Sequence, residues 1–234
     1  MPVPNPILVH GALGGPRCWA PFEGRFPGAA AVGLPGHPDG DATADLEEAV
    51  TRLVRALELV PGPRALVGHG VGAALCVEAA LQRPDLVDGI VGIGLAPELP
   101  VTDDQLMAAF TDPAAEGHRL LLASVSDAGT PEALAVAALM EQAGARALAG
   151  DYQLCRQVRL HGRLGEVACP VLLIAGGDDA WAPPAAVEAL ARELPQAIMA
   201  LVPGARHLVM LDRPATVCLL VAAFLARLEL TLDE

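Results

Sequence analysis

The segment from residue 64 to residue 76 limits the fold more than any other part of this chain. An apolar run leads into a turn with glycines at alternate positions, and a second apolar run follows the turn. The three glycines are Gly68, Gly70 and Gly72. This pattern predicts a buried strand over residues 65–68, a sharp turn, and a helix over residues 71–82.

Short apolar runs alternate with longer helical patterns elsewhere in the chain. The runs predict further strands at residues 6–9, 29–34, 88–92, 170–174 and 198–202. Helices are expected at 43–59, with Thr43 as its cap, at 184–194 and at 214–228. This alternation is typical of the α/β class, in which helices cover both faces of a mostly parallel sheet.

The stretch from residue 96 to residue 167 lacks strand signals. It predicts helices at about 102–110, 113–125, 131–143 and 146–160. We therefore expect a core domain formed by residues 1–95 and 168–234, with residues 96–167 inserted as a helical lid. Open α/β sheets bind ligands at the carboxyl ends of their strands, and a lid would lie there. The alternative is a packed helical subdomain that gates nothing.

Composition narrows the classes of partner. The 234 residues suffice for one domain with an insertion. The formal net charge of −13, with no lysine, disfavours nucleic acid and anionic membranes as partners.

No apolar run reaches the roughly 20 residues of a membrane-spanning helix, and the first residues lack the basic region of a signal peptide. Five scattered cysteines indicate free thiols. We expect a cytoplasmic protein, monomeric or homodimeric.

Three glycine-containing segments follow predicted strands. The first is His10-Gly11-Ala12 with Gly14-Gly15 just beyond it, and the second is the turn at residues 68–72. The third combines residues 176–183, which carry two aspartates and end in proline, with residues 203–207, which end in histidine. Because the strands are expected to be parallel, all three would meet at one edge of the sheet.

These segments together resemble the α/β-hydrolase superfamily. Its pattern is His-Gly, then Gly-x-Ser-x-Gly, then Gly-x-x-Asp-x-x-x-Pro and finally Gly-x-x-His, with nucleophile, acid and base in that order. The resemblance extends from the strand at 7–9 to the helix ending near residue 228. It is closest to small lidded esterases, thioesterases and the succinyl-cyclohexadiene-carboxylate synthases.

The resemblance implies a role for each matching residue. His207 would be the general base, and Asp179 would hold its imidazole in one tautomer. Asp178 and Glu98 are alternative positions for the acid. The backbone N–H groups of Ala12 and Val71 would form an oxyanion hole.

The departure from the family pattern is Gly70, which stands at the nucleophile position and has no side chain to attack with. Three explanations are open. The first is that glycine deliberately replaces the nucleophilic serine of a working hydrolase at this position. The protein can use His207 and Asp179 without a nucleophile, for water attack, elimination, cyclisation or decarboxylation. Or the fold can be catalytically silent and bind a ligand or a protein.

The low aromatic content of 3% predicts a pocket lined mainly by aliphatic side chains, which suits a small apolar ester, thioester or related carbonyl compound. Candidate lining residues are Trp181, Met107, Leu121, Leu122 and Met140. His10, His37 and His69 are interpreted as structural, and His118 and His161 as solvated, capping or pocket-lining. We expect no metal, because no cluster of His, Cys, Asp or Glu has the spacing of metal ligands. We also expect no cofactor. Gly68, Gly70 and Ala73 have the spacing of a dinucleotide-binding motif, but that motif normally lies in the first βα unit of its domain and here two strands precede it.

Overall fold

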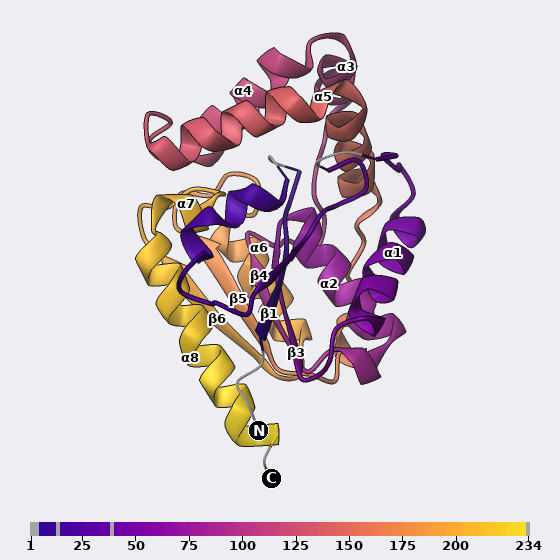
Figure 1. Ribbon diagram of the computed structural model, residues 1–234, viewed down its shortest axis with the longest axis vertical. Coiled ribbons are helices and arrows are strands. Elements are labelled where there is room, and N and C mark those ends of the chain that lie inside the picture. The colour runs from indigo at the N-terminus through magenta and orange to yellow at the C-terminus, as the bar shows by residue number, and fades with distance from the viewer. Residues whose placement is uncertain (1–4, 13–14, 38–39, 233–234) are drawn as a thin grey trace.

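The structure is a computed structural model that describes residues 5–12, 15–37 and 40–232 (Figure 1). Six parallel strands form one sheet in the order β2-β1-β3-β4-β5-β6. Their bounds are β1 Asn5–Val9, β2 Ala30–Val32, β3 Arg64–His69, β4 Gly89–Ile93, β5 Val171–Gly176 and β6 Ala197–Val202. The predicted α/β class is confirmed, and β2 is shorter than the sequence pattern predicted.

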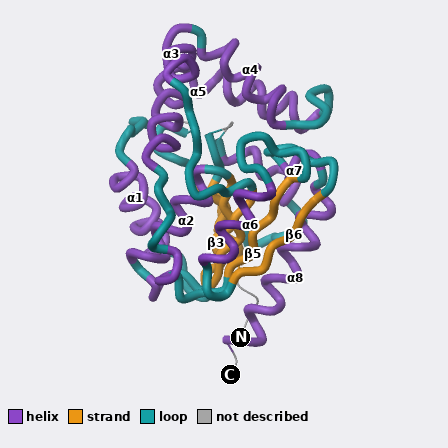
Figure 2. Tube along the Cα trace, turned by 180° about the vertical axis from the view of Figure 1, so that it is seen from behind, coloured by secondary structure: helices purple, strands orange, loops and turns teal. Residues whose placement is uncertain are grey.

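Helices cover both faces of this sheet (Figures 1 and 2). One face packs against α1 Leu46–Glu58, α2 Val71–Gln82 and α6 Pro184–Glu193. The other packs against the 3₁₀ helix η1 Pro16–Phe22 and against α7 Val209–Asp212 and α8 Pro214–Leu232. Each face has its own apolar core, so the central strands are buried on both sides. Two short 3₁₀ helices, η2 Pro84–Leu86 and η3 Leu164–Glu166, complete the connections.

The start of α1 corrects one expectation. Asp45, not Thr43, is the N-cap, because the Asp45 carboxylate accepts the N–H groups of Glu47 and Glu48. The Thr43 hydroxyl instead donates to the Glu48 carboxylate at 2.6 Å. The Asp45 carboxylate at the N-cap also interacts favourably with the positive end of the helix dipole.

Three helices follow β4 and lie beyond the carboxyl ends of the strands (Figures 1 and 2). They are α3 Asp103–Thr111, α4 Pro113–Ser124 and α5 Pro131–Gln157. The two helices predicted over 131–160 are joined into α5, which is interrupted at Gly144, where φ is 73° and ψ is −179°. Within the described ranges, no helix is both long enough and apolar enough to cross a membrane.

Hydrogen bonds attach this helical layer to the core, among them the following two groups. Near the loop after β2, His37 Nε2 donates to the Asp151 carboxylate of α5 at 2.8 Å, and both side chains are buried. At the end of α4, the Leu208 N–H donates to the Ser124 carbonyl at 2.8 Å, and the Arg206 guanidinium donates to the Leu122 carbonyl at 2.9 Å. The second attachment joins the layer to both neighbours of His207.

Candidate active site

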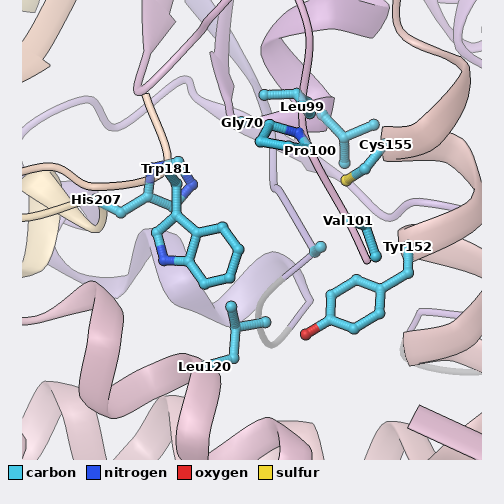
Figure 3. A pocket seen from close by; sticks show the side chains of 11 residues that line it. Gly70, Leu99, Pro100, Val101, Leu120, Tyr152, Cys155, Trp181 and His207 are labelled. Atoms are coloured by element: carbon cyan, nitrogen blue, oxygen red, sulfur yellow. The ribbon is translucent and has the colours of Figure 1, made fainter. Parts of the chain in front are cut away.

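Four loops at the carboxyl ends of the strands form one cavity. Ala12 follows β1, Gly70 and Val71 form the turn from β3 into α2, Trp181 follows β5 and His207 follows β6. All five residues line the same cavity. Gly70, Trp181 and His207 are labelled in Figure 3. The structure therefore brings together residues that are far apart in sequence, at the edge of the sheet where parallel strands end.

His207 and Asp179 form a buried hydrogen-bonded pair. The Nδ1–H of His207 donates to Asp179 Oδ2 at 2.9 Å, and the residues are 8% and 4% exposed. The other oxygen of Asp179 accepts the N–H groups of Trp181 at 2.8 Å and Ala182 at 3.0 Å. Burial alone would raise the pKa of the Asp179 carboxyl, but the hydrogen bond and charge of His207 and the two amides outweigh it and lower that pKa. Asp179 is thus kept as an anion that orients the imidazole.

The free nitrogen of this imidazole faces Gly70. A Cβ atom built on Gly70 would lie 3.5 Å from His207 Nε2 and 4.0 Å from its Cε1. Gly70 has φ 52° and ψ −122°, and its N–H donates to the Ile93 carbonyl at 2.9 Å. Val71 is the first residue of α2, so its N–H has no acceptor within the helix. The cavity therefore holds a proton acceptor, a helix N-terminus and open space next to the imidazole.

Neither alternative acid contacts this imidazole. The Asp178 side chain is exposed, while its N–H donates to the Ala205 carbonyl. The Glu98 side chain is 60% exposed and pairs with Arg159 at 3.6 Å. Of the three candidate acids, Asp179 is the one whose carboxylate contacts the His207 imidazole.

The cavity walls are almost entirely apolar. The remaining lining residues come from the chain after β4, from α4 and from α5, and they are Leu99, Pro100, Val101, Leu120, Tyr152 and Cys155 (Figure 3). The cavity has a volume of about 50 Å³. That volume suits a small apolar group rather than a long chain.

The other predicted lining residues lie elsewhere. Met107 is 62% exposed and Leu122 is 46% exposed, so both point toward solvent. Leu121 and Met140 are buried in the apolar cluster that continues to the α8 side of the sheet, and they do not line this cavity. Helical spacing alone does not reveal which face of α4 or α5 turns toward the sheet, and this is why Leu120 and Tyr152 were missed.

A polar cluster supports the wall from behind. The Tyr152 hydroxyl donates to Glu116 at 2.7 Å, and two guanidinium nitrogens of Arg119 donate to the same carboxylate at 2.7 and 2.6 Å. Burial would raise the pKa of Glu116, but Arg119 and Tyr152 together lower it. Arg119 also lies over the Trp181 ring, 5.9 Å from its centroid. The spacing of Glu116 and Arg119, three residues apart on one helix, was the available sequence signal for this cluster.

Two other histidines, His69 and His10, are buried at the ends of strands of the sheet. The His69 ring lies 4.5 Å from the His207 ring, and its Nε2–H donates to the His207 carbonyl at 3.2 Å. His10 donates from Nδ1 to the Gly11 carbonyl and accepts the Leu34 N–H at Nε2. Burial, with a smaller contribution from a neighbouring imidazole, lowers the pKa of each to about 3. Both rings are therefore neutral and connect loops.

The remaining histidines lie away from the cavity. His37 is paired with Asp151, and its ring makes an edge contact with His10 at 4.8 Å. His118 is exposed, and His161 is exposed and pairs with Glu193. Gly14, part of the first predicted segment, lies outside the described residues.

The described part of the chain, residues 5–12, 15–37 and 40–232, contains no cluster of three His, Cys, Asp or Glu side chains that can hold a metal ion. The five cysteines are free, and Cys155 lies in the cavity wall. Burial raises the pKa of the Cys155 thiol, so this sulfur is a protonated, apolar part of the wall.

The fold and this arrangement of loops are those of the α/β hydrolases. Comparison with known families agrees: the chain belongs to the alpha/beta hydrolase family, whose model matches residues 7–218.

Among curated proteins the chain is similar to two pimeloyl-(acyl-carrier protein) methyl ester esterases. That of Aromatoleum aromaticum is 29% identical over 93% of this chain and 96% of its own length. That of Nitrosomonas europaea is 24% identical over 90% of this chain and 91% of its own length. Among solved structures, an enol-lactonase from Burkholderia xenovorans superposes with a TM-score of 0.86 at 17% identity, over 97% of this chain and 92% of that one.

Proposed function

We propose that this protein hydrolyses a small apolar ester or thioester without a nucleophilic side chain. In this proposal His207, held by Asp179, removes a proton from a water molecule beside Gly70, and that water attacks the substrate carbonyl directly. Gly70 takes the place that serine has in the family pattern Gly-x-Ser-x-Gly. The esterase relatives support the reaction class.

One observation carries the proposal. His207 Nε2 lies 3.5 Å from the point where a Cβ of residue 70 would be, and its Nδ1 is already bound to Asp179. An oxygen atom near that point is within hydrogen-bond reach of Nε2. A neutral imidazole with this tautomer presents a lone pair at Nε2, so the pair can accept a proton from whatever nucleophile lies there.

The remaining parts of the cavity provide for the substrate. The Val71 and Ala12 N–H groups are the proposed donors to the oxygen that becomes negative as the tetrahedral intermediate forms. The apolar walls formed by Leu99, Val101 and Trp181 suit an uncharged acyl or aryl group. In this proposal α3–α5 act as the lid that excludes bulk water, leaving room for a short acyl chain.

The expected rate enhancement is modest. In a serine protease, removing the triad leaves about 10³–10⁴-fold acceleration over water, through the oxyanion hole and binding. General-base catalysis contributes a further factor of about 10²–10⁴ in enzymes that use it. We therefore expect slow but measurable turnover of activated esters.

The experiment compares hydrolysis of p-nitrophenyl acetate, butyrate and octanoate by the wild-type protein and by His207→Gln. We expect His207→Gln to lose at least about 10²-fold in kcat/KM. The octanoate should be the poorest substrate because of the cavity's small volume. His118→Gln, the same change at an exposed histidine, is the matched control and should retain the wild-type rate. Equal rates for wild type and His207→Gln would refute the proposal.

A second candidate is a binding protein that has kept the fold and lost turnover. Gly70 favours it, because a glycine removes the covalent step of the family reaction. Gly70→Ser separates the two candidates. If that variant hydrolyses esters while the wild type shows no turnover that depends on His207, the cavity is intact and the native protein binds rather than converts its ligand.

A further inference from the structure

We infer that this site is also an acyltransferase that passes an acyl group directly to a small external nucleophile bound between Gly70 and His207. The inference rests on the proposed ester hydrolysis and extends it from water to alcohols and hydroxylamine. In a serine esterase the first nucleophile is fixed in the chain. Here its place is open to a second substrate.

The space for this nucleophile is defined by the atoms around residue 70. Apart from the chain neighbours of Gly70, the described atoms within 4 Å of its hypothetical Cβ belong to the His207 ring alone, at 3.5 Å for Nε2 and 4.0 Å for Cε1. A carbon built there is thus at van der Waals distance from the imidazole. The structure therefore leaves room at this point for a heavy atom next to Nε2.

The same point adjoins the acyl-binding cavity. Gly70, Val71 and His207 line it together with Trp181 and the apolar residues that follow β4. A nucleophile next to His207 Nε2 and an ester carbonyl next to the Val71 N–H would be neighbours. Holding two reactants side by side in this way replaces a bimolecular encounter with a reaction inside one complex.

The reaction balances without any further reagent. The nucleophile, H–O–CH₃ or H–NH–OH, gives its proton to His207 Nε2 while its oxygen or nitrogen forms a bond to the carbonyl carbon. The tetrahedral intermediate then collapses, the bond to the leaving oxygen breaks, and His207 returns the proton to that oxygen. The products are the methyl ester or hydroxamate and the released alcohol, and no acyl-enzyme forms.

The size of the cavity selects the acceptor. Acceptor and acyl group must share a cavity of about 50 Å³. Methanol and hydroxylamine are among the smallest acceptors, whereas tert-butanol brings three methyl groups that must enter the same cavity. We therefore expect acceptors of two heavy atoms to react and tert-butanol to be inert.

The test follows p-nitrophenol release from p-nitrophenyl butyrate at increasing concentrations of methanol or hydroxylamine, and identifies the acyl product by mass spectrometry. The release rate should rise at least about tenfold and saturate, and methyl butyrate or butyrohydroxamate should form in proportion. His207→Gln should show no saturable increase, and His118→Gln should behave like the wild type. Mass spectrometry of the protein should show no acyl adduct on the wild type and an adduct on Gly70→Ser.

Two results overturn the inference in different ways. If hydrolysis depends on His207 but the acceptors cause no saturable, His207-dependent increase, transfer is wrong and the hydrolase proposal stands. If neither water nor the acceptors give turnover that depends on His207, both are wrong.

Circular dichroism of each variant establishes that it is folded, and Gly70→Ala provides a second check. Its methyl group takes the acceptor position, so it should lose the response to methanol.

Discussion

At the scale of single residues, the glycines of the turn between β3 and α2 have different reasons to be glycine. Gly70 has a positive φ of 52°, which disfavours any other residue, but a Cβ there would make no close contact with the described atoms. A Cβ on Gly72 would instead collide with the carbonyl oxygens of Val9 and His10 at the end of β1. Backbone strain therefore disfavours other residues at position 70, and a collision with the backbone of β1 excludes them at position 72.

This difference predicts unequal costs of alanine substitution. Gly70→Ala should lower the free energy of unfolding by about 1–3 kcal/mol, the cost of a non-glycine residue in such a conformation. Gly72→Ala should lower it by about 3 kcal/mol or more, because β1 and α2 must move apart. Urea unfolding monitored by circular dichroism measures both. The explanation is wrong if Gly72→Ala is as stable as Gly70→Ala.

Asp179 allows a prediction about chemistry at the same scale. Asp179→Asn keeps the shape of the side chain but removes the charge that holds His207 with its proton on Nδ1. In the serine protease triad this change lowers turnover about 10⁴-fold. We expect a loss of about 10³–10⁴-fold in any ester turnover of this protein, measured as kcat/KM for p-nitrophenyl butyrate. A loss of less than tenfold would mean that the pair does not act as proposed.

The same variant has a pH signature in stability. The folded state lowers the pKa of Asp179, so its contribution to stability is complete above the unfolded value of about 4 and is lost as the pH falls through the folded value. The stability difference between wild type and Asp179→Asn should therefore shrink at acid pH.

At the scale of elements, α5 is held to the core by a buried ion pair. Burial alone would lower the pKa of His37, but Asp151 outweighs it and raises that pKa. The second oxygen of Asp151 is buried and has no hydrogen-bond partner among the described residues. Asp151 therefore depends on His37 for its stabilisation.

His37→Gln should consequently destabilise the protein. Leaving a buried charge without its partner costs about 3–5 kcal/mol. Because the folded pKa of His37 is raised, the stabilisation is complete below the unfolded value of about 6.5 and is lost as the pH rises through the folded value. Burial already raises the pKa of the Asp151 carboxyl, and in His37→Gln it is no longer lowered by the imidazole, so this carboxyl can take up a proton as the pH falls. Urea unfolding at a series of pH values from acid to alkaline should therefore show the deficit of His37→Gln smaller at the acid end. A constant deficit would contradict this assignment of charge.

The elements also explain what the sequence could and could not predict. The strands, the turn at Gly70 and the loops carrying Asp179 and His207 were predictable, because a parallel sheet forces the residues after its strands to meet at one edge. The cavity-lining residues of α4 and α5 were not. Their apolar positions are spread around both helices, so the choice of Leu120 over Leu121 and Leu122 depends on how the helices pack against the core. The residues Leu99 and Val101, which follow β4, could have been found by extending the rule about strand ends.

At the scale of the whole molecule, the net negative charge and the buried neutral imidazoles respond to pH in different ways. The net charge of −13 disfavours association with other acidic molecules at neutral pH. The interior contains His10 and His69, both fully buried and both with a pKa lowered to about 3. The unfolded chain can protonate these imidazoles near pH 6.5, whereas the folded chain cannot.

This predicts acid destabilisation that begins well above the range where carboxylates titrate. Each of the two histidines makes the unfolded state bind one more proton, so the free energy of unfolding should fall as the pH drops below about 6.5, with a slope approaching about 2.7 kcal/mol per pH unit. Because His37 acts in the opposite direction above this pH, stability should be greatest near pH 6.5. Urea unfolding between pH 7 and pH 5, above the isoelectric point of about 4.8, measures the slope. His69→Gln should halve it and His118→Gln should leave it unchanged, whereas a flat profile down to pH 5 would mean that the buried imidazoles accept protons in the folded protein.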